Sequence, residues 1–298
     1  MLTVNPKEVK TSDFHSYLLG AVAPRPIAFA STIDAAGSPN LAPFSFFNVF
    51  SAKPPIAIFS PARSGRNGRT KNTLDNVKEV GEVVINIVNY DMVQQVSLAS
   101  TEYAKGVNEF EKAGFTSIPS ELIRPFRVKE SPVQLECIVK DIIELGTEGG
   151  AGNLVICEVV LMHIDKRILD KNNHIDPHKI DLVGRMGGNW YNRANGNSLF
   201  EVTKPIQNLG IGVDKIPAYI RTSKVLTGNN LGQLGNIEKL PDANEIIAYR
   251  NSGAINEAYE IYGTNSEKLH EHLHHLAKGL LENNKVEEAW KVLLSSGK

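Results

Sequence analysis

Two long apolar runs joined by a glycine-rich turn restrict the possible folds of this chain most strongly. The runs are VQLECIVKDIIEL (residues 133–145) and NLVICEVVLMHI (residues 153–164), and the turn between them reads GTEGGAG. In the first run Val133, Leu135 and Cys137 alternate with polar residues, which is the period of a strand with one buried face. So short a connection joins antiparallel neighbours, and the two runs therefore predict a pair of long antiparallel strands.

Further strand-like runs extend this pattern over the first part of the chain. They are a hairpin within PRPIAFASTIDAAGSPNLAPFSFFN (24–48), then PPIAIFSP (54–61) and GEVVINIVN (81–89). Five or six strands joined mostly by turns favour an antiparallel sheet closed into a barrel, and hence a mainly β, α+β fold. We expect two helices within it, one after RTKNT with Leu74, Val77 and Val80 as its apolar face, and one near residues 92–103. Because helices and strands do not alternate regularly, a doubly wound parallel sheet is the weaker alternative.

The character of the sequence changes after the last strand-like run. We place the barrel in residues 1–204 and a C-terminal extension in residues 205–298. The first part of the extension is rich in Gly and Asn without a clear period, and we expect an extended arm there. Beyond Pro241 the pattern predicts helices at residues 243–262, 266–282 and 286–294. In the middle helix, leucines at spacings of four, three and four form one packing stripe, namely Leu269, Leu273, Leu276 and Leu280.

Composition and charge exclude several classes of function. The 298 residues carry a formal net charge of −1, so no excess basic charge is present to bind nucleic acid or an anionic membrane. The N-terminus lacks a basic segment followed by an apolar stretch, and no window approaches the roughly 20 apolar residues that span a bilayer. Cys137 and Cys157 have no CxxC spacing, which favours reduced core thiols over a disulfide or redox pair. We therefore expect a cytoplasmic protein.

The segment HEHLH (270–274) is a literal match to the HExxH pattern of zinc proteases. That spacing places two imidazoles one helical turn apart, with the glutamate beside the metal-bound water. Here, however, Glu271 falls almost opposite the leucine stripe, and nothing nearby in the sequence supplies an obvious third ligand. A solvated, histidine-rich helix face is the favoured interpretation, and a zinc hydrolase is an alternative function.

Signals for nucleotide binding are indirect in this chain. It contains neither GxGxxG nor GxxxxGK[ST], so a phosphate site would have to be built differently. The stretch RSGRNGRTKNTLDNV places Arg63, Arg66, Arg69 and Lys71 in a glycine-containing loop that leads into a helix. Free amides at a helix N-terminus, with cations and the Thr73 hydroxyl converging there, predict an anion site. The alternative is a basic surface loop with an ordinary helix cap.

Polar residues and a proline interrupt the first hairpin where apolar side chains would pack better. They are Ser31, Thr32, Pro43, Ser45 and Asn48. Hydroxyls, an amide and backbone freed by proline can offer donors and acceptors to a planar heterocycle, with Phe44 and Phe46 as apolar cover. A flat, polar-edged ring together with a phosphate indicates a mononucleotide, and FMN is the obvious candidate. The alternative is a barrel hairpin with incidental hydroxyls.

An ordered series of motifs runs through the first two thirds of the chain. It reads PRPIAFAST, PNLAPFSFFN, PPIAIFS, KNTLDN, GEVVINIV, YAKGVNEFEKAGF, SPVQLECIV, GNLVICEVVLMHI and VGRMGGNWY. The series, which covers roughly residues 10–193, resembles the flavin reductase-like, FMN-binding domains of split-barrel fold, a group that includes the flavoredoxins. This resemblance implies an antiparallel split β-barrel with short helices, and a homodimer that holds FMN near the subunit interface.

The resemblance also implies roles for individual residues, although it indicates no catalytic acid or base. The residues expected at the flavin ring and ribityl chain are Ser31, Thr32, Pro43, Phe44, Ser45, Phe46 and Asn48, and those expected at the phosphate are Arg69, Lys71 and Thr73. Lys105 would approach the ring or the phosphate, and Trp190 or Tyr191 would cover an open face of the ring.

The implied activity is an FMN-dependent oxidoreductase. NADH or NADPH would pass a hydride to the flavin, and the electrons would then reach an unknown acceptor or a partner protein. Many members of the family have a histidine in the turn before the strand that begins at Asn153, where this chain has Gly152. We therefore expect slow reduction by nicotinamide nucleotides. The alternatives are a flavoredoxin-like electron carrier and a non-enzymatic flavin-binding module.

Overall fold

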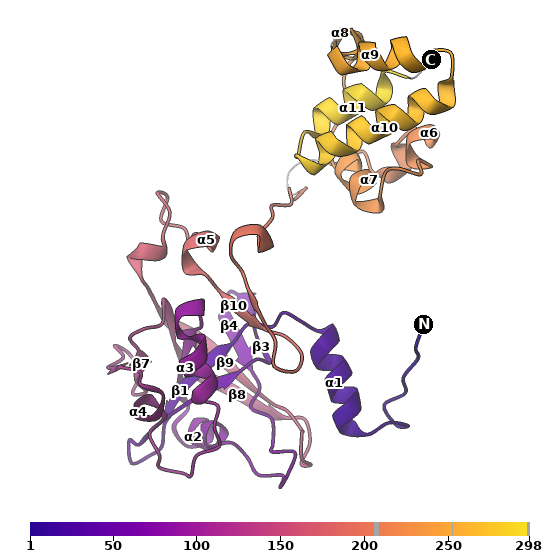
Figure 1. Ribbon diagram of the computed structural model, residues 1–298. Coiled ribbons are helices and arrows are strands. Elements are labelled where there is room, and N and C mark those ends of the chain that lie inside the picture. Colours follow the sequence, from indigo (N-terminus) through magenta and orange to yellow (C-terminus); the bar gives the residue numbers. More distant parts are fainter. Residues whose placement is uncertain (206–208, 252, 297–298) are drawn as a thin grey trace. The chain divides into compact units, whose positions relative to one another are not determined.

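Antiparallel strands organise the N-terminal part of the molecule. The computed structural model describes residues 1–205, 209–251 and 253–296, and the chain divides into two units, Met1–Phe200 and Glu201–Lys298. The first unit contains a seven-stranded sheet in the order β2-β1-β5-β8-β9-β4-β3 (Figure 1). Its strands are β1 (Ala28–Ile33), β2 (Pro39–Phe44), β3 (Phe47–Ala52), β4 (Pro55–Phe59), β5 (Glu82–Ile87), β8 (Val133–Glu144) and β9 (Asn153–Ile164). All neighbouring strands are antiparallel, which confirms the predicted mixed α+β fold.

The predicted pair of long strands forms the middle of this sheet. β8 and β9 pair from Val133 opposite Ile164 to Glu144 opposite Asn153, with two irregularities in register that bend the ribbon. Their inward side chains join a core that includes both cysteines. Burial raises the pKa of Cys157 to about 12, so this free thiol stays protonated at neutral pH.

Short helices cover the sheet and connect its strands. They are α1 (Thr11–Ala21), α2 (Asn72–Val80), η1 (Tyr90–Met92), α3 (Val93–Leu98), α4 (Glu109–Ala113), η2 (Lys166–Ile168), α5 (Pro177–Ile180) and η3 (Gly196–Ser198), with two small ribbons, β6 (Ser117–Ile118) with β7 (Arg127–Val128) and β10 (Val183–Arg185) with β11 (Tyr191–Arg193). Leu74 and Val77 of α2 are buried in the core, as predicted. Gly81, at φ 74°, ends this helix in a left-handed conformation that suits glycine.

The helix expected near residues 92–103 is shorter than predicted. α3 ends at Leu98, and the hydroxyls of Ser100 and Thr101 donate to the carbonyls of Ser97 and Leu98. These bonds satisfy terminal carbonyls that a longer helix would use for its own ladder. Residues beyond Leu98 are therefore free to form a loop.

The second unit is helical almost throughout. Its elements are η4 (Val213–Lys215), α6 (Ala218–Arg221), α7 (Gly228–Gly235), α8 (Ala243–Arg250), α9 (Gly253–Tyr262), α10 (Ser266–Glu282) and α11 (Val286–Leu294). The last two have the predicted bounds, whereas the predicted helix at 243–262 is two helices. Leu234, Leu273, Leu281 and Trp290 are fully buried in its core. Within the described residues, no helix of the chain has the length and apolar character needed to cross a bilayer.

The prediction of an extended arm from residue 205 is wrong for the described part of this segment. Residues 206–208 lie outside the described residues, but the segment that follows contains η4, α6 and α7 and contributes Ile220 and Leu234 to the helical core. A reciprocal capping box between Thr227 and Asn230 begins α7 despite its glycines. The side-chain caps and buried contacts outweigh the poor helix propensity that suggested an arm.

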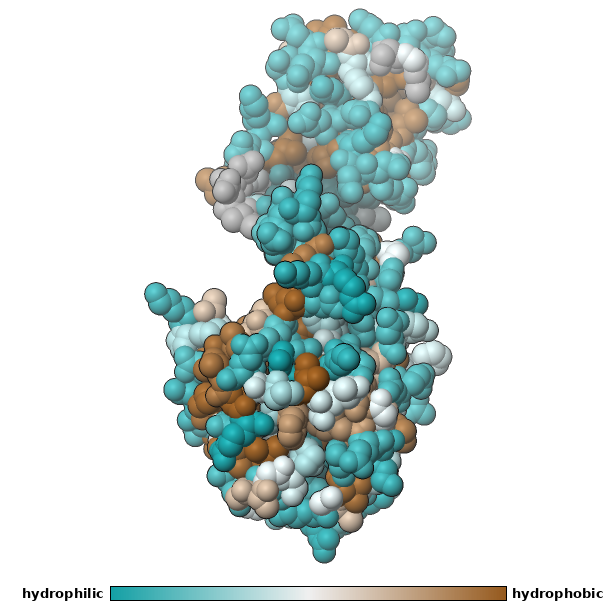
Figure 2. All heavy atoms as spheres, turned by 90° about the vertical axis from the view of Figure 1, so that its left-hand side faces the viewer, coloured by the Kyte–Doolittle hydropathy of each residue, from teal (hydrophilic) through white to brown (hydrophobic). Residues whose placement is uncertain are grey.

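Several apolar side chains of the first unit remain exposed. Val49 and Phe50 lie on the edge strand β3, and Phe50 is 65% exposed. Val160 and Met162 on β9 are also exposed. Figure 2 shows apolar residues gathered on one flank of the first unit. Exposed apolar side chains on a sheet are typical of a surface that contacts another molecule.

Candidate functional site

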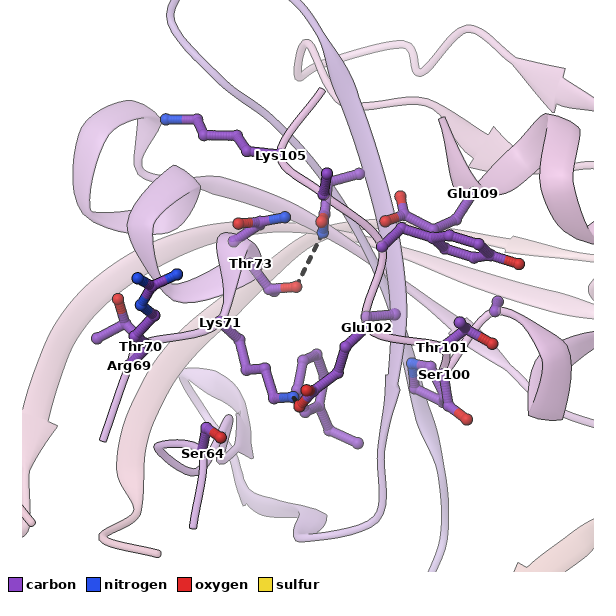
Figure 3. A pocket seen from close by; sticks show the side chains of 18 of the residues that line it. Ser64, Arg69, Thr70, Lys71, Thr73, Ser100, Thr101, Glu102, Lys105 and Glu109 are labelled. Atoms are coloured by element: carbon purple, nitrogen blue, oxygen red, sulfur yellow. Dashed lines mark hydrogen bonds and ion pairs between the residues drawn. The ribbon is translucent and has the colours of Figure 1, made fainter. Parts of the chain in front are cut away.

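A pocket of about 540 Å³ opens in the first unit where three segments of the chain meet. β2 forms one side, the loop of residues 64–70 with the start of α2 forms another, and residues 99–109 form the third (Figure 3). Ala42, Pro43 and Phe44 provide apolar surface, while most of the other lining residues carry hydroxyl, amide or charged groups. A concave site with one apolar side and many polar groups is suited to a small organic ligand with a charged end.

The N-terminus of α2 forms part of the pocket lining and has unused hydrogen-bond donors. Lys71 is its N-cap residue and makes no capping hydrogen bond through its side chain. Within the described residues, no acceptor takes up the backbone N–H of Asn72 or of Thr73. We call these two amides, with the side chains of Lys71 and Thr73, the α2 cradle. Free amides, the positive end of the helix dipole and an ammonium group can together bind an anion.

A buried hydrogen-bond chain fixes the hydroxyl of the α2 cradle. Asn40 Nδ2 donates to Thr73 Oγ1 at 2.9 Å and lies 3.3 Å from Thr32 Oγ1. Asn76 Nδ2 also donates to Thr32 Oγ1, at 3.1 Å. All four side chains are buried. Because Thr73 Oγ1 accepts from Asn40, its own proton is available to a ligand.

Charges of both signs face each other across the pocket. Lys71 Nζ forms an ion pair with Glu102 Oε1 from the loop after α3. The hydrogen bond and the charge of Lys71 lower the pKa of the Glu102 carboxyl, which is ionised at neutral pH. Arg69 and Lys105 line the same pocket and add positive charge. Since Lys71 already holds a carboxylate oxygen, its ammonium is positioned to hold an anionic group inside the pocket.

Two cations anchor the loop and helix of the α2 cradle to the end of β8. Arg63 Nη2 lies 2.8 Å from Glu144 Oε2, and Lys78 Nζ binds the other oxygen of the same carboxylate. Within the loop, the N–H of Ser64 donates to Arg69 O and the N–H of Gly68 donates to Ser64 O, both at 2.9 Å. A smaller pocket of about 470 Å³ adjoins this loop and shares Lys71 and Glu102 with the main pocket.

The structure brings together about half of the residues that the sequence singled out. Those that line the main pocket are Pro43, Phe44, Arg69, Lys71, Thr73 and Lys105. Ser31 and Thr32 are completely buried in β1, where Thr32 supports the cradle from behind and Ser31 Oγ has no hydrogen-bond partner within the described residues. β1 is covered on both faces, so its hydroxyls cannot reach the pocket of this chain.

The remaining residues of the sequence prediction lie elsewhere on the first unit. Ser45 Oγ is 3.5 Å from Arg25 Nε, and the ring of Phe46 packs edge-on against that of His15. Asn48 is exposed on the edge strand β3. Trp190 is 78% exposed, and Tyr191 lines a separate pocket of about 350 Å³. These residues do not converge on the main pocket within one chain.

The turn at residues 149–153, where many family members have a histidine, contributes no side chain to the lining of the main pocket. Asn153 is fully buried, and its Nδ2 donates to Pro61 O at 2.7 Å. A Cβ on Gly152 would lie 2.9 Å from Ser60 Oγ, so a larger residue there would have to displace that hydroxyl. The amide of Asn153, the first polar side chain after the turn, is therefore used for internal structure.

The histidine-rich helix lies in the second unit. The ring of His270 stacks on that of Tyr219, and His274 Nδ1 lies 2.8 Å from Ser223 Oγ. Glu271 is exposed, as the leucine stripe predicted. In the parts of the chain that the structure describes, no group of three His, Cys, Asp or Glu side chains is placed to hold a metal ion.

Sequence reasoning missed three polar residues of the pocket lining. Asn40, Glu102 and Glu109 all line the pocket, and none was singled out as a site residue. Glu109 is 5% exposed, and burial raises the pKa of its carboxyl. The available signal was the segment NEFEKAG, in which Asn108 caps α4 and leaves a glutamate at the first helical position. Only the packing of α4 against β2 places that glutamate at the pocket.

Comparison with known proteins identifies the family. Residues 20–179, more than half of the chain, match the flavin reductase like domain. The chain belongs to the flavin reductase-like family. An uncharacterized protein of Aquifex aeolicus is 34% identical over 197 residues, which are 66% of this chain and 97% of that protein.

Solved structures of this family share the fold of the first unit. Nitrilotriacetate monooxygenase component B from Bacillus cereus has 31% sequence identity and a TM-score of 0.62, covering 68% of this chain and 98% of that one. A flavin reductase with a split barrel domain from Shewanella frigidimarina has 24% identity and a TM-score of 0.58, covering 68% and 99%. The predicted split-barrel fold is confirmed. Each match covers nearly all of the other protein and about two thirds of this flavin reductase-like chain.

Proposed function

We propose that the main pocket binds FMN, with the phosphate in the α2 cradle. The single observation that carries this proposal is the cradle itself: two unused amides, a hydroxyl with a free proton and the Lys71 ammonium lie at one end of the pocket. This donor set fits a phosphate dianion, which accepts several charge-assisted hydrogen bonds. Membership of the flavin reductase-like family supports a flavin nucleotide over other phosphate esters.

The chain's own residues would position the cofactor and tune its surroundings. Lys71 would exchange the carboxylate of Glu102 for the phosphate, while Asn40 keeps the Thr73 hydroxyl oriented. Pro43 and Phe44 would provide an apolar surface beside the ring or the ribityl chain. Bound FMN would supply the two-electron redox chemistry, which the protein does not provide from side chains alone.

We further propose an oxidoreductase that takes a hydride from NADH or NADPH and passes the electrons to a separate acceptor. Family membership supports this activity, and one structural relative is named as component B of a monooxygenase. Such a name points to an acceptor on a second protein. The chemistry of a flavin reductase-like site then requires an open pocket, and this pocket is partly open to solvent.

A second candidate is an FMN electron carrier that reacts poorly with nicotinamide nucleotides. The specific observation in its favour is the turn at residues 149–153, where Gly152 has no side chain and the amide of Asn153 is bonded to Pro61. No titratable group from this turn reaches the pocket. The two candidates share the cofactor and differ in the electron donor.

One series of measurements tests both candidates. The absorption spectrum of the purified protein, followed by titration of the stripped protein with FMN, tests the cofactor through its visible bands and fluorescence quenching. Stopped-flow mixing with NADH, NADPH or dithionite then tests the donor. Rapid bleaching by a nicotinamide nucleotide supports the oxidoreductase, and bleaching by dithionite alone supports the carrier. A protein that binds no flavin would overturn both.

We also propose that the first unit forms a homodimer through its exposed apolar flank. Val49, Phe50, Val160 and Met162 are exposed on strands β3 and β9, where a second copy would remove them from water. The dispersed positions of Ser45, Asn48 and Trp190 also support a dimer, because residues from a second subunit would be needed to gather such a set around one flavin. Light scattering after size-exclusion chromatography would test it, and Phe50→Glu should convert a dimer to a monomer.

A further inference from the structure

Glu109 is a buried carboxyl group at the edge of the main pocket. It is the first residue of α4, directly after the N-cap Asn108, and only 5% of it is exposed. Its Oε2 accepts a hydrogen bond from the backbone N–H of Leu41 at 3.0 Å. Figure 3 shows Glu109 and the α2 cradle on opposite sides of the pocket. Its carboxyl group is part of the pocket lining and is therefore within reach of a ligand held there.

In the part of the chain that the structure describes, this buried acid has no cation as an ion-pair partner. β2 and α3, the elements packed against α4, contain no titratable side chain. The charged or titratable groups around it are Glu111 and Lys112 on its own helix, Glu102, Tyr103 and Lys105 on the preceding loop, and Lys71 across the pocket. Within the described residues, none of them forms an ion pair with Glu109. Burial therefore dominates and raises the pKa of this carboxyl.

The structural role of Glu109 does not require an acid. The N–H of Leu41 needs only an acceptor, and the carbonyl of a glutamine would serve equally well in the same position. A glutamine would also avoid the cost of burying an ionisable group without a partner. What the carboxyl adds is a proton that it can release and regain. Unpaired buried acids that line a pocket are typical of sites where a proton moves.

We propose that Glu109 is the proton-transfer group of this pocket, an inference that rests on the proposed function. As a hydride from NADH or NADPH delivers two electrons and one proton, the O–H bond of the Glu109 carboxyl breaks and supplies the second proton to the flavin held in the pocket. The nicotinamide is oxidised by two electrons and the flavin is reduced by two. The Glu109 carboxylate then regains its proton from water at the open mouth of the pocket.

Proton linkage of FMN binding tests this role without turnover. A bound ring covers Glu109 further and favours its protonated form, so binding should take up protons at pH values above the ordinary glutamate pKa of ~4.3. Calorimetric titration with FMN in two buffers of different ionisation enthalpy counts these protons. The difference between the wild type and Glu109→Gln cancels the titration of the phosphate itself. Glu111→Gln, which removes the same charge from an exposed position on α4, is the matched control.

The expected result is a proton uptake that Glu109→Gln loses and Glu111→Gln retains. In stopped-flow reduction by NADH or NADPH, Glu109→Gln should be slower by about 10²-fold, the lower end for general acid catalysis. The rate of the wild type should fall as pH rises through the raised pKa of Glu109, because the acid form is the donor, and the rate of the variant should be flat.

Two results would overturn the proposal in distinguishable ways. Equal proton uptake and equal pH profiles for the wild type and Glu109→Gln, with FMN bound by both, would overturn the role of Glu109 alone. A wild type that binds no FMN would overturn the proposed function and this inference with it. If Glu109→Gln does not fold, Glu109→Asp keeps the proton at a shorter reach. It should retain the pH dependence at a lower rate, and an unchanged rate would contradict the proposal.

Discussion

The two charged walls of the pocket, the α2 cradle and the facing acids Glu102 and Glu109, arise in different ways. The α2 cradle is a local structure, because its ammonium, its amides and its hydroxyl all come from three successive residues, Lys71 to Thr73. The facing wall takes its two acids from different settings: Glu102 is an exposed loop residue, and Glu109 is buried at the start of α4. Local structure can be recognised from a motif, whereas the acidic wall exists only after the loop and α4 have packed on β2. If the proposals above hold, phosphate binding and proton transfer are the work of separate walls.

Removing the cradle should give the largest effect. Lys71→Ala combined with Thr73→Ala should weaken FMN binding by roughly one to two orders of magnitude for each hydrogen bond lost, since charge-assisted bonds contribute about 1.5–3 kcal/mol. Fluorescence quenching of FMN measures the affinity. Lys129→Ala, which removes the same charge from an exposed position outside the pocket, is the matched control and should bind FMN as the wild type does. Equal losses in both variants would contradict a specific cradle.

Thr32→Val should separate direct ligands from the residues that support them. Thr32 Oγ1 accepts from both Asn40 and Asn76, and valine would remove the acceptor of the buried Asn76 amide and leave Asn40 only its bond to Thr73. We expect the free energy of unfolding to fall by about 1–3 kcal/mol, with a smaller effect on FMN affinity than in the cradle variants. Urea denaturation measures the first and fluorescence titration the second. A loss of affinity without loss of stability would show that Thr32 contacts the flavin itself.

Burial of Glu109 should make the free energy of unfolding depend on pH. The pKa of Glu109 is raised in the folded protein, so its protonated form contributes stability below the ordinary pKa and that contribution is lost as pH rises through the raised value. Glu109→Gln should therefore be more stable than the wild type at neutral pH. The difference should shrink below about pH 4, where the carboxyl is protonated in both states. Thermal unfolding of the flavin-free proteins across this range provides the measurement, and a pH-independent difference would contradict it.

The smallest effect is expected from Glu102. Glu102→Gln should strengthen FMN binding by a few-fold at most, because exposed ion pairs contribute little and Lys71 would no longer be shared. Because Lys71 lowers the pKa of Glu102, the competition is present at neutral pH and disappears only as pH falls through that lowered value. The gain should also diminish in high salt. Weaker binding in Glu102→Gln would mean that this glutamate positions Lys71 for the phosphate.

Local patterns in the sequence predicted the parts of the fold that depend on neighbours along the chain. The period of β8, the turn before β9, the apolar face of α2 and the bounds of α10 and α11 all follow from residues within a few positions of one another. Arg69, Lys71 and Thr73 could be predicted as an anion site for the same reason, since they lie in one short stretch of the chain. The succession of strands favoured an antiparallel sheet closed into a barrel, and the resemblance to the flavin reductase-like family implied its split-barrel form.

Tertiary packing decided the parts that the sequence did not reveal. Ser31 and Thr32 have the polarity of ligands, but β1 is buried on both faces, and a hydroxyl pattern does not report what covers a strand. α7 forms in a segment with three glycines because Leu234 and the capping box outweigh its low propensity. The segment NEFEKAG indicated a glutamate at the start of a helix but not its place in the pocket, because Glu109 accepts its hydrogen bond from Leu41, 68 positions earlier in the chain.

Through the carboxylate of Glu144, formation of the α2 cradle depends on the correct register of strand β8. This carboxylate binds Arg63 before the cradle and Lys78 after it, from the last position of β8. Side chains alternate between the faces of a sheet, so a slip of β8 by one residue would turn this carboxylate to the opposite face and release both cations. A chain with the wrong strand register would then lack a formed phosphate site. If the pocket binds FMN as proposed, cofactor binding would accordingly discriminate between correctly and incorrectly paired barrels.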